Sequence, residues 1–135
     1  MIKTMQFIGI FISIAIMGMS CSYAQTDGVA EDITVKDAYE KIQNGGDFIL
    51  LDVRTDGECA QGMLPGAMQI DYYGSDFMDE VSKLDKDLPL IVYCASGGRS
   101  SEAMRKLSKA GFKEVYNVKG GYKKWNADKL PTTKG

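Results

Sequence analysis

The sequence predicts a single α/β domain whose mainly parallel sheet is covered by helices on both faces. Apolar, β-branched runs typical of strands buried on both faces alternate along the chain with segments that have the spacing of helices. The chain has 135 residues, 44% hydrophobic and 25% charged, which is enough for one hydrophobic core but not for two. No internal repeat or interior linker divides it.

The expected elements follow one another with short connections. A first helix begins at a capping box formed by Thr34 and Asp37, and Gly45 ends it. Further helices are expected at residues 56–61, 76–84 and 101–110 and around Trp125. Strands are expected at residues 48–53, 67–70, 90–93 and 114–118. Met68 and Trp125 are expected to fill the core, whereas Gly120 and Gly121 allow close backbone approach.

The most informative segment joins the strand at residues 90–93 to the following helix, which Ser100 is expected to cap. Cys94 stands at the end of the strand, before the sequence ASGGRS. In a loop that curls over Cys94, the N–H groups of residues 95–99 and the helix dipole point at the sulfur and lower its pKa. The alternative is a small buried hydrophobe, but such a cysteine needs no glycines, arginine and helix cap beside it.

The rest of the composition narrows the chemistry. The chain has no histidine, and its three cysteines form no CxxC pair, so neither a Cys-His dyad nor a metal pattern is present in the sequence. No cofactor is expected, and activation of Cys94 is assigned to backbone amides, the helix dipole and Arg99. The net charge of -2, without aromatic residues among the basic segments, does not support nucleic-acid binding.

Four segments in order resemble the rhodanese-like sulfurtransferases. They are LDVRT at 51–55, GMLPGA at 62–67, CASGGRS at 94–100 and GFKEVYNVKGG at 111–121, followed by Trp125. The resemblance covers residues 32–131 and implies a rhodanese-like domain with about five strands. It also implies that Cys94 takes sulfane sulfur from a small sulfur-containing anion such as thiosulfate. The sulfur is then held as a persulfide and passed to a thiol or cyanide.

The resemblance also assigns roles to single residues. Cys94 and Arg99 are the expected catalytic residues, and the expected substrate-binding residues are Ala95, Ser96, Gly97, Gly98 and Ser100. Asp52 and Arg54, at the end of a strand, are expected to have a supporting role, in which an ion pair ties loops together; the alternative is direct contact with the substrate. Met63 stands where the family often has histidine.

The spacing within the loop separates related activities. Four residues lie between Cys94 and Arg99, as in the sulfurtransferases, whereas the related phosphatases and arsenate reductases have five. The sequence therefore favours sulfur chemistry. The alternative kept open is a persulfide carrier or binding module that receives sulfur from a protein partner. In either case the domain is expected to be a monomer.

The first 24 residues have the pattern of an export signal. Lys3 is the only charge before Asp27, and the apolar run at residues 7–19 is too short to span a membrane. Cleavage after Ala24 is expected; the alternative is lipidation of Cys21, where Gly18 departs from the usual leucine. Residues 25–31 and 132–135 are expected to be tails. The protein is thus expected in the periplasm or cell envelope.

The remaining cysteine, Cys59, has two interpretations. In the oxidising periplasm a disulfide with Cys94 would require Cα atoms within about 7 Å. Because the family places an aromatic core residue at this position, packing in the core is favoured for Cys59.

Overall fold

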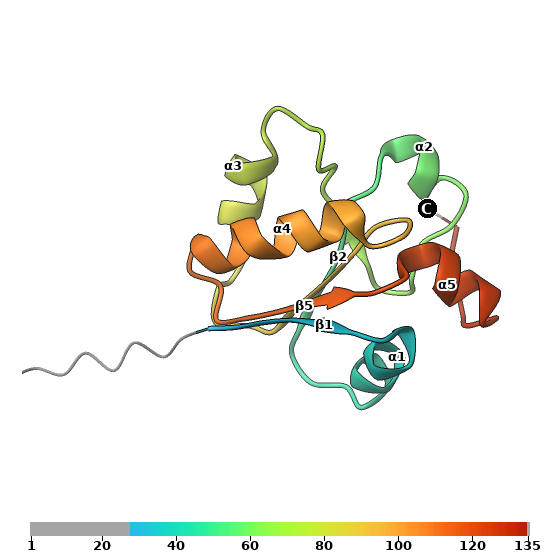
Figure 1. Ribbon diagram of the computed structural model, residues 1–135. Helices are drawn as coiled ribbons and strands as arrows, with labels where there is room; N and C mark the ends of the chain where they lie inside the picture. The colour runs from blue at the N-terminus through green and yellow to red at the C-terminus, as the bar shows by residue number, and fades with distance from the viewer. Residues whose placement is uncertain (1–27, 135) are drawn as a thin grey trace, which may run out of the picture.

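The computed structural model describes residues 28–134 and shows one parallel sheet with helices on both faces (Figure 1). Its strands are β1 (Val29–Ile33), β2 (Ile49–Asp52), β3 (Met68–Gln69), β4 (Leu90–Tyr93) and β5 (Glu114–Val118). Its helices are α1 (Val35–Gln43), α2 (Asp56–Cys59), α3 (Phe77–Ser82), α4 (Gly98–Lys109) and α5 (Gly121–Ala127). The predicted α/β fold with about five strands is confirmed.

The strand order β1-β5-β4-β2-β3 places β4 at the centre of the sheet. All neighbouring strands are parallel; Leu51 of β2 lies opposite Val92 of β4, and Ile91 of β4 lies opposite Tyr116 of β5. Every residue of β4 is buried, because its continuous apolar run supplies both faces of the sheet. Parallel strands end at one edge of the sheet, so the chain after β4 emerges beside the end of β2.

Alternating side chains divide the core into two layers. On one face Val92 belongs to a cluster with Phe77 of α3 and Leu107 of α4. On the other face Ile91 belongs to a cluster with Trp125 of α5 and residues of α1. Figure 1 accordingly shows α3 and α4 on one side of the sheet and α1 and α5 on the other. The two-residue repeat of β4 therefore holds both layers to the strand that precedes Cys94.

The first helix begins and ends as the sequence predicts. The N–H of Asp37 donates to Oγ1 of Thr34 across 3.0 Å, and the N–H of Thr34 donates to Oδ2 of Asp37 across 3.2 Å. At the other end Asn44 caps the helix, and Gly45 follows in a left-handed conformation at φ 73°. Both ends are thus satisfied by local groups.

Of the two residues predicted to fill the core, Trp125 does so and Met68 does not. Trp125 is buried, and its Nε1–H donates to the carbonyl oxygen of Pro131 across 2.8 Å. Met68, in contrast, is 41% exposed. The prediction for Met68 was wrong because β3 is a two-residue strand at the sheet edge, paired only with β2.

Parts of both expected tails belong to the fold. β1 begins at Val29, which lies opposite Glu114 of β5, so the sheet starts within the segment 25–31. At the other end Thr133 forms an antiparallel bridge with Met63, with N–H to carbonyl distances of 2.7 and 2.8 Å. The expected export signal and Cys21 lie outside the described residues. Within residues 28–134, no helix has the length and apolar character needed to cross a membrane.

Candidate active site

Cys94 is the first residue after the central strand, and its side chain is buried beneath the loop that follows. The Sγ atom accepts a hydrogen bond from the backbone N–H of Gly97 at 3.1 Å and from the hydroxyl of Ser100 at 3.4 Å. The loop therefore curls back over the sulfur, as the sequence predicts. Such donors stabilise a thiolate more than a thiol, because their hydrogen bonds are stronger to the charged form.

A left-handed residue makes this curl. Gly97 has φ 112° and is the N-cap of α4, which begins at Gly98. The expectation that Ser100 caps the helix was wrong, because the turn at Gly97 starts the helix before residue 101. Ser100 therefore lies in the first turn, where its hydroxyl is free to reach the sulfur.

The surroundings of the sulfur lower the pKa of Cys94 below its ordinary value. Burial has the largest effect and raises the pKa, but hydrogen bonds outweigh it. They come first from the hydroxyl of Ser100 and then from the backbone N–H groups of Ser100, Gly97 and Ser96. The donors thus include two of the amides expected from residues 95–99, together with a residue beyond them.

The start of α5 is hydrogen-bonded to the backbone of the Cys94 loop. The N–H of Tyr122 donates to the carbonyl oxygen of Cys94 across 2.8 Å, and the N–H of Lys123 donates to that of Ala95 across 3.0 Å. Gly121 makes this approach possible, since a Cβ there would overlap the Cys94 carbonyl oxygen, and its φ is 57°. The sequence prediction of close backbone approach is confirmed at Gly121.

Arg99 points to a residue that the sequence interpretation did not select. Its two terminal nitrogens donate to the two carboxylate oxygens of Glu58, each across 2.7 Å. The hydrogen bonds from Arg99 are the main reason that the pKa of Glu58 is lowered to about 2. The only local sign of Glu58 was the Thr55-x-x-Glu58 pattern, which is a capping box for α2.

Asp52 and Arg54 form a buried ion pair beside this site, with Nη2 and Oδ2 separated by 2.7 Å. Arg54 also donates from Nη2 to the carbonyl oxygen of Gly62 at 2.6 Å and from Nη1 to that of Glu58 at 3.4 Å. Among the described residues, neither member of the pair donates a hydrogen bond to the sulfur of Cys94. The pair joins the end of β2 to α2 and to the turn that follows.

Comparisons with known proteins identify the family of the chain. The family model for the rhodanese-like domain matches residues 34–128. This chain belongs to the rhodanese-like domain family. A sulfurtransferase of Allochromatium vinosum is 32% identical over 103 residues, which cover 76% of this chain and 94% of that protein. The thiosulfate sulfurtransferase GlpE of Glaesserella parasuis is 34% identical over 105 residues, covering 77% of this chain and 94% of that protein.

Solved structures show the same fold. A rhodanese-related protein from Thermoplasma volcanium superposes with a TM-score of 0.68 at 30% identity, covering 78% of this chain and 99% of that one. A rhodanese-like domain protein from Staphylococcus aureus gives a TM-score of 0.64 at 29% identity, covering 70% and 90%. The rhodanese-like fold of this chain is therefore shown by both sequence and structure.

The second cysteine of this rhodanese-like domain is part of its core. Cys59 is buried, and both it and Cys94 are free thiols, so the two described cysteines form no disulfide. Burial is the main cause that raises the pKa of Cys59 to about 12. Core packing is therefore confirmed for Cys59, and its environment disfavours the thiolate that the Cys94 loop favours.

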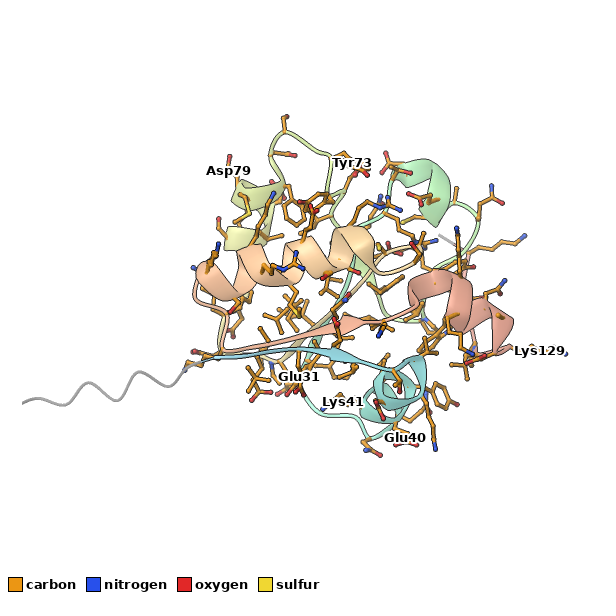
Figure 2. All side chains as sticks on the ribbon, viewed as in Figure 1. Glu31, Glu40, Lys41, Tyr73, Asp79 and Lys129 are labelled. Carbon is orange, nitrogen blue, oxygen red and sulfur yellow. The ribbon has the colours of Figure 1, made fainter. Side chains whose placement is uncertain are left out.

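A hollow of about 250 Å³ lies where β4 and β5 begin, whereas the Cys94 loop follows the end of β4. Its lining includes Phe48, Ile91 and Tyr116, and the ammonium of Lys41 lies 4.4 Å from the ring centre of Tyr116. Figure 2 shows Lys41 on α1, across the sheet from α4. Within residues 28–134, no three His, Cys, Asp or Glu side chains are grouped to hold a metal.

Proposed function

We propose that this rhodanese-like domain is a sulfurtransferase. It moves sulfane sulfur from thiosulfate, or a related small sulfur-containing anion, to a thiol or cyanide through a persulfide on Cys94. The observation that carries the proposal is the sulfur of Cys94, which receives hydrogen bonds from Gly97 and Ser100 at the start of α4. Hydrogen bonds to the sulfur lower the pKa of the Cys94 thiol and so favour the thiolate, which is the nucleophilic form of cysteine.

In the first half-reaction, the Cys94 thiolate attacks the outer sulfur of thiosulfate. A new S–S bond forms to Cys94 while the S–S bond of thiosulfate breaks, and sulfite leaves with the electron pair. The total charge is unchanged, and no cofactor takes part. The persulfide anion that results is stabilised by the donors of Ser96, Gly97 and Ser100, which already surround the sulfur.

In the second half-reaction, the acceptor attacks the terminal sulfur of the persulfide. With cyanide, a C–S bond forms, the S–S bond to Cys94 breaks, and thiocyanate leaves. The electron pair returns to Cys94 as thiolate, so the cycle closes. A thiol acceptor reacts in the same way as its thiolate and departs as a persulfide. Arg99, which is bound by Glu58 of α2, holds the Cys94 loop in place beside α2 during both steps.

A second candidate is a persulfide carrier that receives sulfur from a protein partner. The bidentate pair between Arg99 and Glu58 favours it, because Arg99 offers less free charge to a small anion. Tyr73 adds to this, since it is 69% exposed and lies 5.6 Å from the Arg99 guanidinium carbon, measured to its ring centre. Figure 2 shows Tyr73 on the loop before α3, beside α2. An exposed aromatic residue beside the site is typical of a protein contact.

Export to the periplasm or cell envelope belongs to the same proposal, with residues 1–24 as the signal or Cys21 as a lipid anchor. The arrangement of the sheet is compatible with an anchor. β1 starts at Val29 beside the beginning of β5, whereas Cys94 follows the end of β4 at the other edge. A tethered protein would therefore present the Cys94 loop on the side away from the start of β1. We propose that the domain acts as a monomer.

The test is an intact-mass measurement after incubation of the purified protein with thiosulfate, followed by addition of cyanide and an assay for thiocyanate. We expect a gain of one sulfur that maps to Cys94 and is lost to cyanide. The variant Cys94→Ser should gain none, whereas the matched control Cys59→Ala should still gain it. Failure of thiosulfate, together with sulfur uptake from a protein persulfide, would favour the carrier. Turnover by Cys94→Ser would overturn both candidates.

A further inference from the structure

The positive charge of Arg99, which follows the Cys94 loop, is already paired. Both terminal nitrogens of Arg99 are bound to the carboxylate of Glu58, at 2.7 Å each, and the side chains are 18% and 34% exposed. The ring of Tyr73 lies over the same guanidinium. Arg99 therefore presents a neutral pair, rather than a free cation, to whatever approaches the sulfur.

The partner of Arg99 is itself held in place. The N–H and the hydroxyl of Thr55 both donate to Oε2 of Glu58, each across 3.0 Å. The carbonyl oxygen of Glu58 accepts a hydrogen bond from the buried side chain of Arg54. Because the carboxylate is bound on both sides and ionised at neutral pH, the pair does not need to be assembled when a substrate arrives. The pair is therefore a constant feature beside the Cys94 loop.

The thiolate does not depend on a free Arg99. The groups that stabilise it are the hydroxyl of Ser100 and the backbone N–H groups of Ser96, Gly97 and Ser100. These neutral donors serve any sulfane donor equally. The charge of the donor interacts instead with the carboxylate of Glu58, and the repulsion between them grows with each negative charge on the donor.

We infer that Glu58 is a specificity-determining residue that disfavours dianionic sulfane donors relative to donors with one negative charge, such as alkanethiosulfonates and persulfides. The inference rests on the proposed sulfurtransferase function and deepens it. Thiosulfate remains a substrate, but it is held back by the carboxylate that neutralises Arg99. Selectivity by repulsion of the wrong substrate is a general route to specificity.

The experiment compares two donors that differ in charge but react through the same bond. Thiosulfate is a dianion; methanethiosulfonate replaces one of its oxygens by a methyl group and is a monoanion. In each case the Cys94 thiolate takes the outer sulfur, the S–S bond breaks, and sulfite or methanesulfinate leaves with the electron pair. The rate constant for persulfide formation on Cys94 is measured by mass for the full chain and for Glu58→Gln.

Glu58→Gln removes the negative charge and keeps one side-chain oxygen that can accept from Thr55, while one nitrogen of Arg99 loses its acceptor. We expect it to accelerate thiosulfate by about fivefold and methanethiosulfonate by about twofold, since the electrostatic energy is proportional to the donor charge. An unchanged ratio of the two rates would overturn the inference while leaving the proposed function intact. Absence of sulfur on Cys94 from either donor in the unmodified protein would overturn the proposed function, and the inference with it.

Two further variants test whether the change in donor ratio is specific to the charge of Glu58. Asp56→Asn removes a carboxylate from the same helix, where Asp56 accepts from Gln69 and does not contact Arg99. It should leave the donor ratio near that of the unmodified protein, and a rise equal to that of Glu58→Gln would contradict a specific role. Arg99→Gln leaves the Glu58 charge uncompensated, so the ratio should fall in favour of methanethiosulfonate. A rise in the Arg99→Gln variant would also overturn the inference.

Discussion

The N–H of Tyr122 donates to the carbonyl oxygen of Cys94 across 2.8 Å, which ties the start of α5 to the residue whose sulfur lies under the loop. The contact brings two backbone segments together without side chains between them. It explains why Gly121 precedes Tyr122, since any side chain at that position would occupy the space of the Cys94 carbonyl group. The shape of the loop is therefore set from outside as well as by its own glycines.

Gly121→Ala should displace the Cys94 loop. The left-handed backbone at φ 57° and the overlap with the carbonyl oxygen together predict a loss of about 3 kcal/mol in the free energy of unfolding. Sulfur uptake by Cys94 should fall as well. Urea unfolding and persulfide formation measure the two effects.

The matched control is Gly45→Ala. Gly45 also has a left-handed backbone, at φ 73°, but a Cβ there would meet nothing within 4 Å. Gly45→Ala should lower the free energy of unfolding by about 1 kcal/mol, the cost of the left-handed backbone alone, and sulfur uptake by Cys94 should be unchanged. Equal losses for the two variants would show that crowding at Cys94 is unimportant.

Ser100→Ala should raise the pKa of Cys94. The hydroxyl donates to the sulfur across 3.4 Å, and a hydrogen bond to a charged group favours the charged form. The midpoint of the alkylation rate against pH should move up by about one pH unit, as expected for such a bond. Iodoacetamide labelling, with the site read by peptide mass, measures it.

Ser101→Ala provides the control for this change. Ser101 is the next residue of α4, and its hydroxyl oxygen accepts from Arg105. The variant should keep the alkylation midpoint of Cys94. A midpoint that stays in place in Ser100→Ala would mean that the backbone donors alone stabilise the thiolate.

What the sequence predicted well depends on interactions between near neighbours. The capping box of Thr34 and Asp37, the buried run of β4 and the glycine turn after Cys94 each involve residues only a few positions apart. Interactions of this kind require particular residue types at fixed spacings, so they can be recognised in the sequence. The fold and the loop that surrounds the sulfur of Cys94 followed from such patterns and from the family resemblance.

What the sequence did not predict depends on distant or weakly patterned contacts. Glu58 and Arg99 are 41 positions apart, and the capping box at Thr55 already accounts for Glu58 locally. β1 was not recognised because four of its five residues are exposed and no apolar run marks it. The bridge between Met63 and Thr133 is equally invisible, since one pair of backbone hydrogen bonds needs no particular side chains.

The ion pair of Glu58 should make stability depend on pH in the acid range. The folded state holds the pKa of Glu58 at about 2, below its ordinary value of 4.5, so the unfolded state binds the proton more readily. The contribution is therefore complete above about pH 4.5 and is lost as pH falls towards 2. Thermal unfolding of the unmodified protein and of Glu58→Gln should give melting temperatures that converge over this interval. A difference that stays constant with pH would contradict the assignment.

Asp52→Asn should be the most destabilising of these changes. The side chains of Arg54 and Asp52 are 3% and 0% exposed, and the variant leaves the guanidinium buried without its countercharge. Loss of one partner from a buried pair typically costs about 3–5 kcal/mol. Because Arg54 also binds the carbonyl oxygens of Glu58 and Gly62, the loss of structure should extend to α2 and to the turn that follows it.

Urea unfolding of Asp52→Asn is best compared with Glu80→Gln. Glu80 pairs with Lys83 at 2.7 Å, the same distance as in the buried pair, but these side chains are exposed to solvent. Solvent screening should limit the cost of Glu80→Gln to less than about 1 kcal/mol. A similarly small loss in the free energy of unfolding of both variants would mean that Arg54, once released from Asp52, is stabilised by other groups or by solvent. A large loss in Asp52→Asn alone would establish that burial, rather than geometry, makes this pair indispensable to the end of β2.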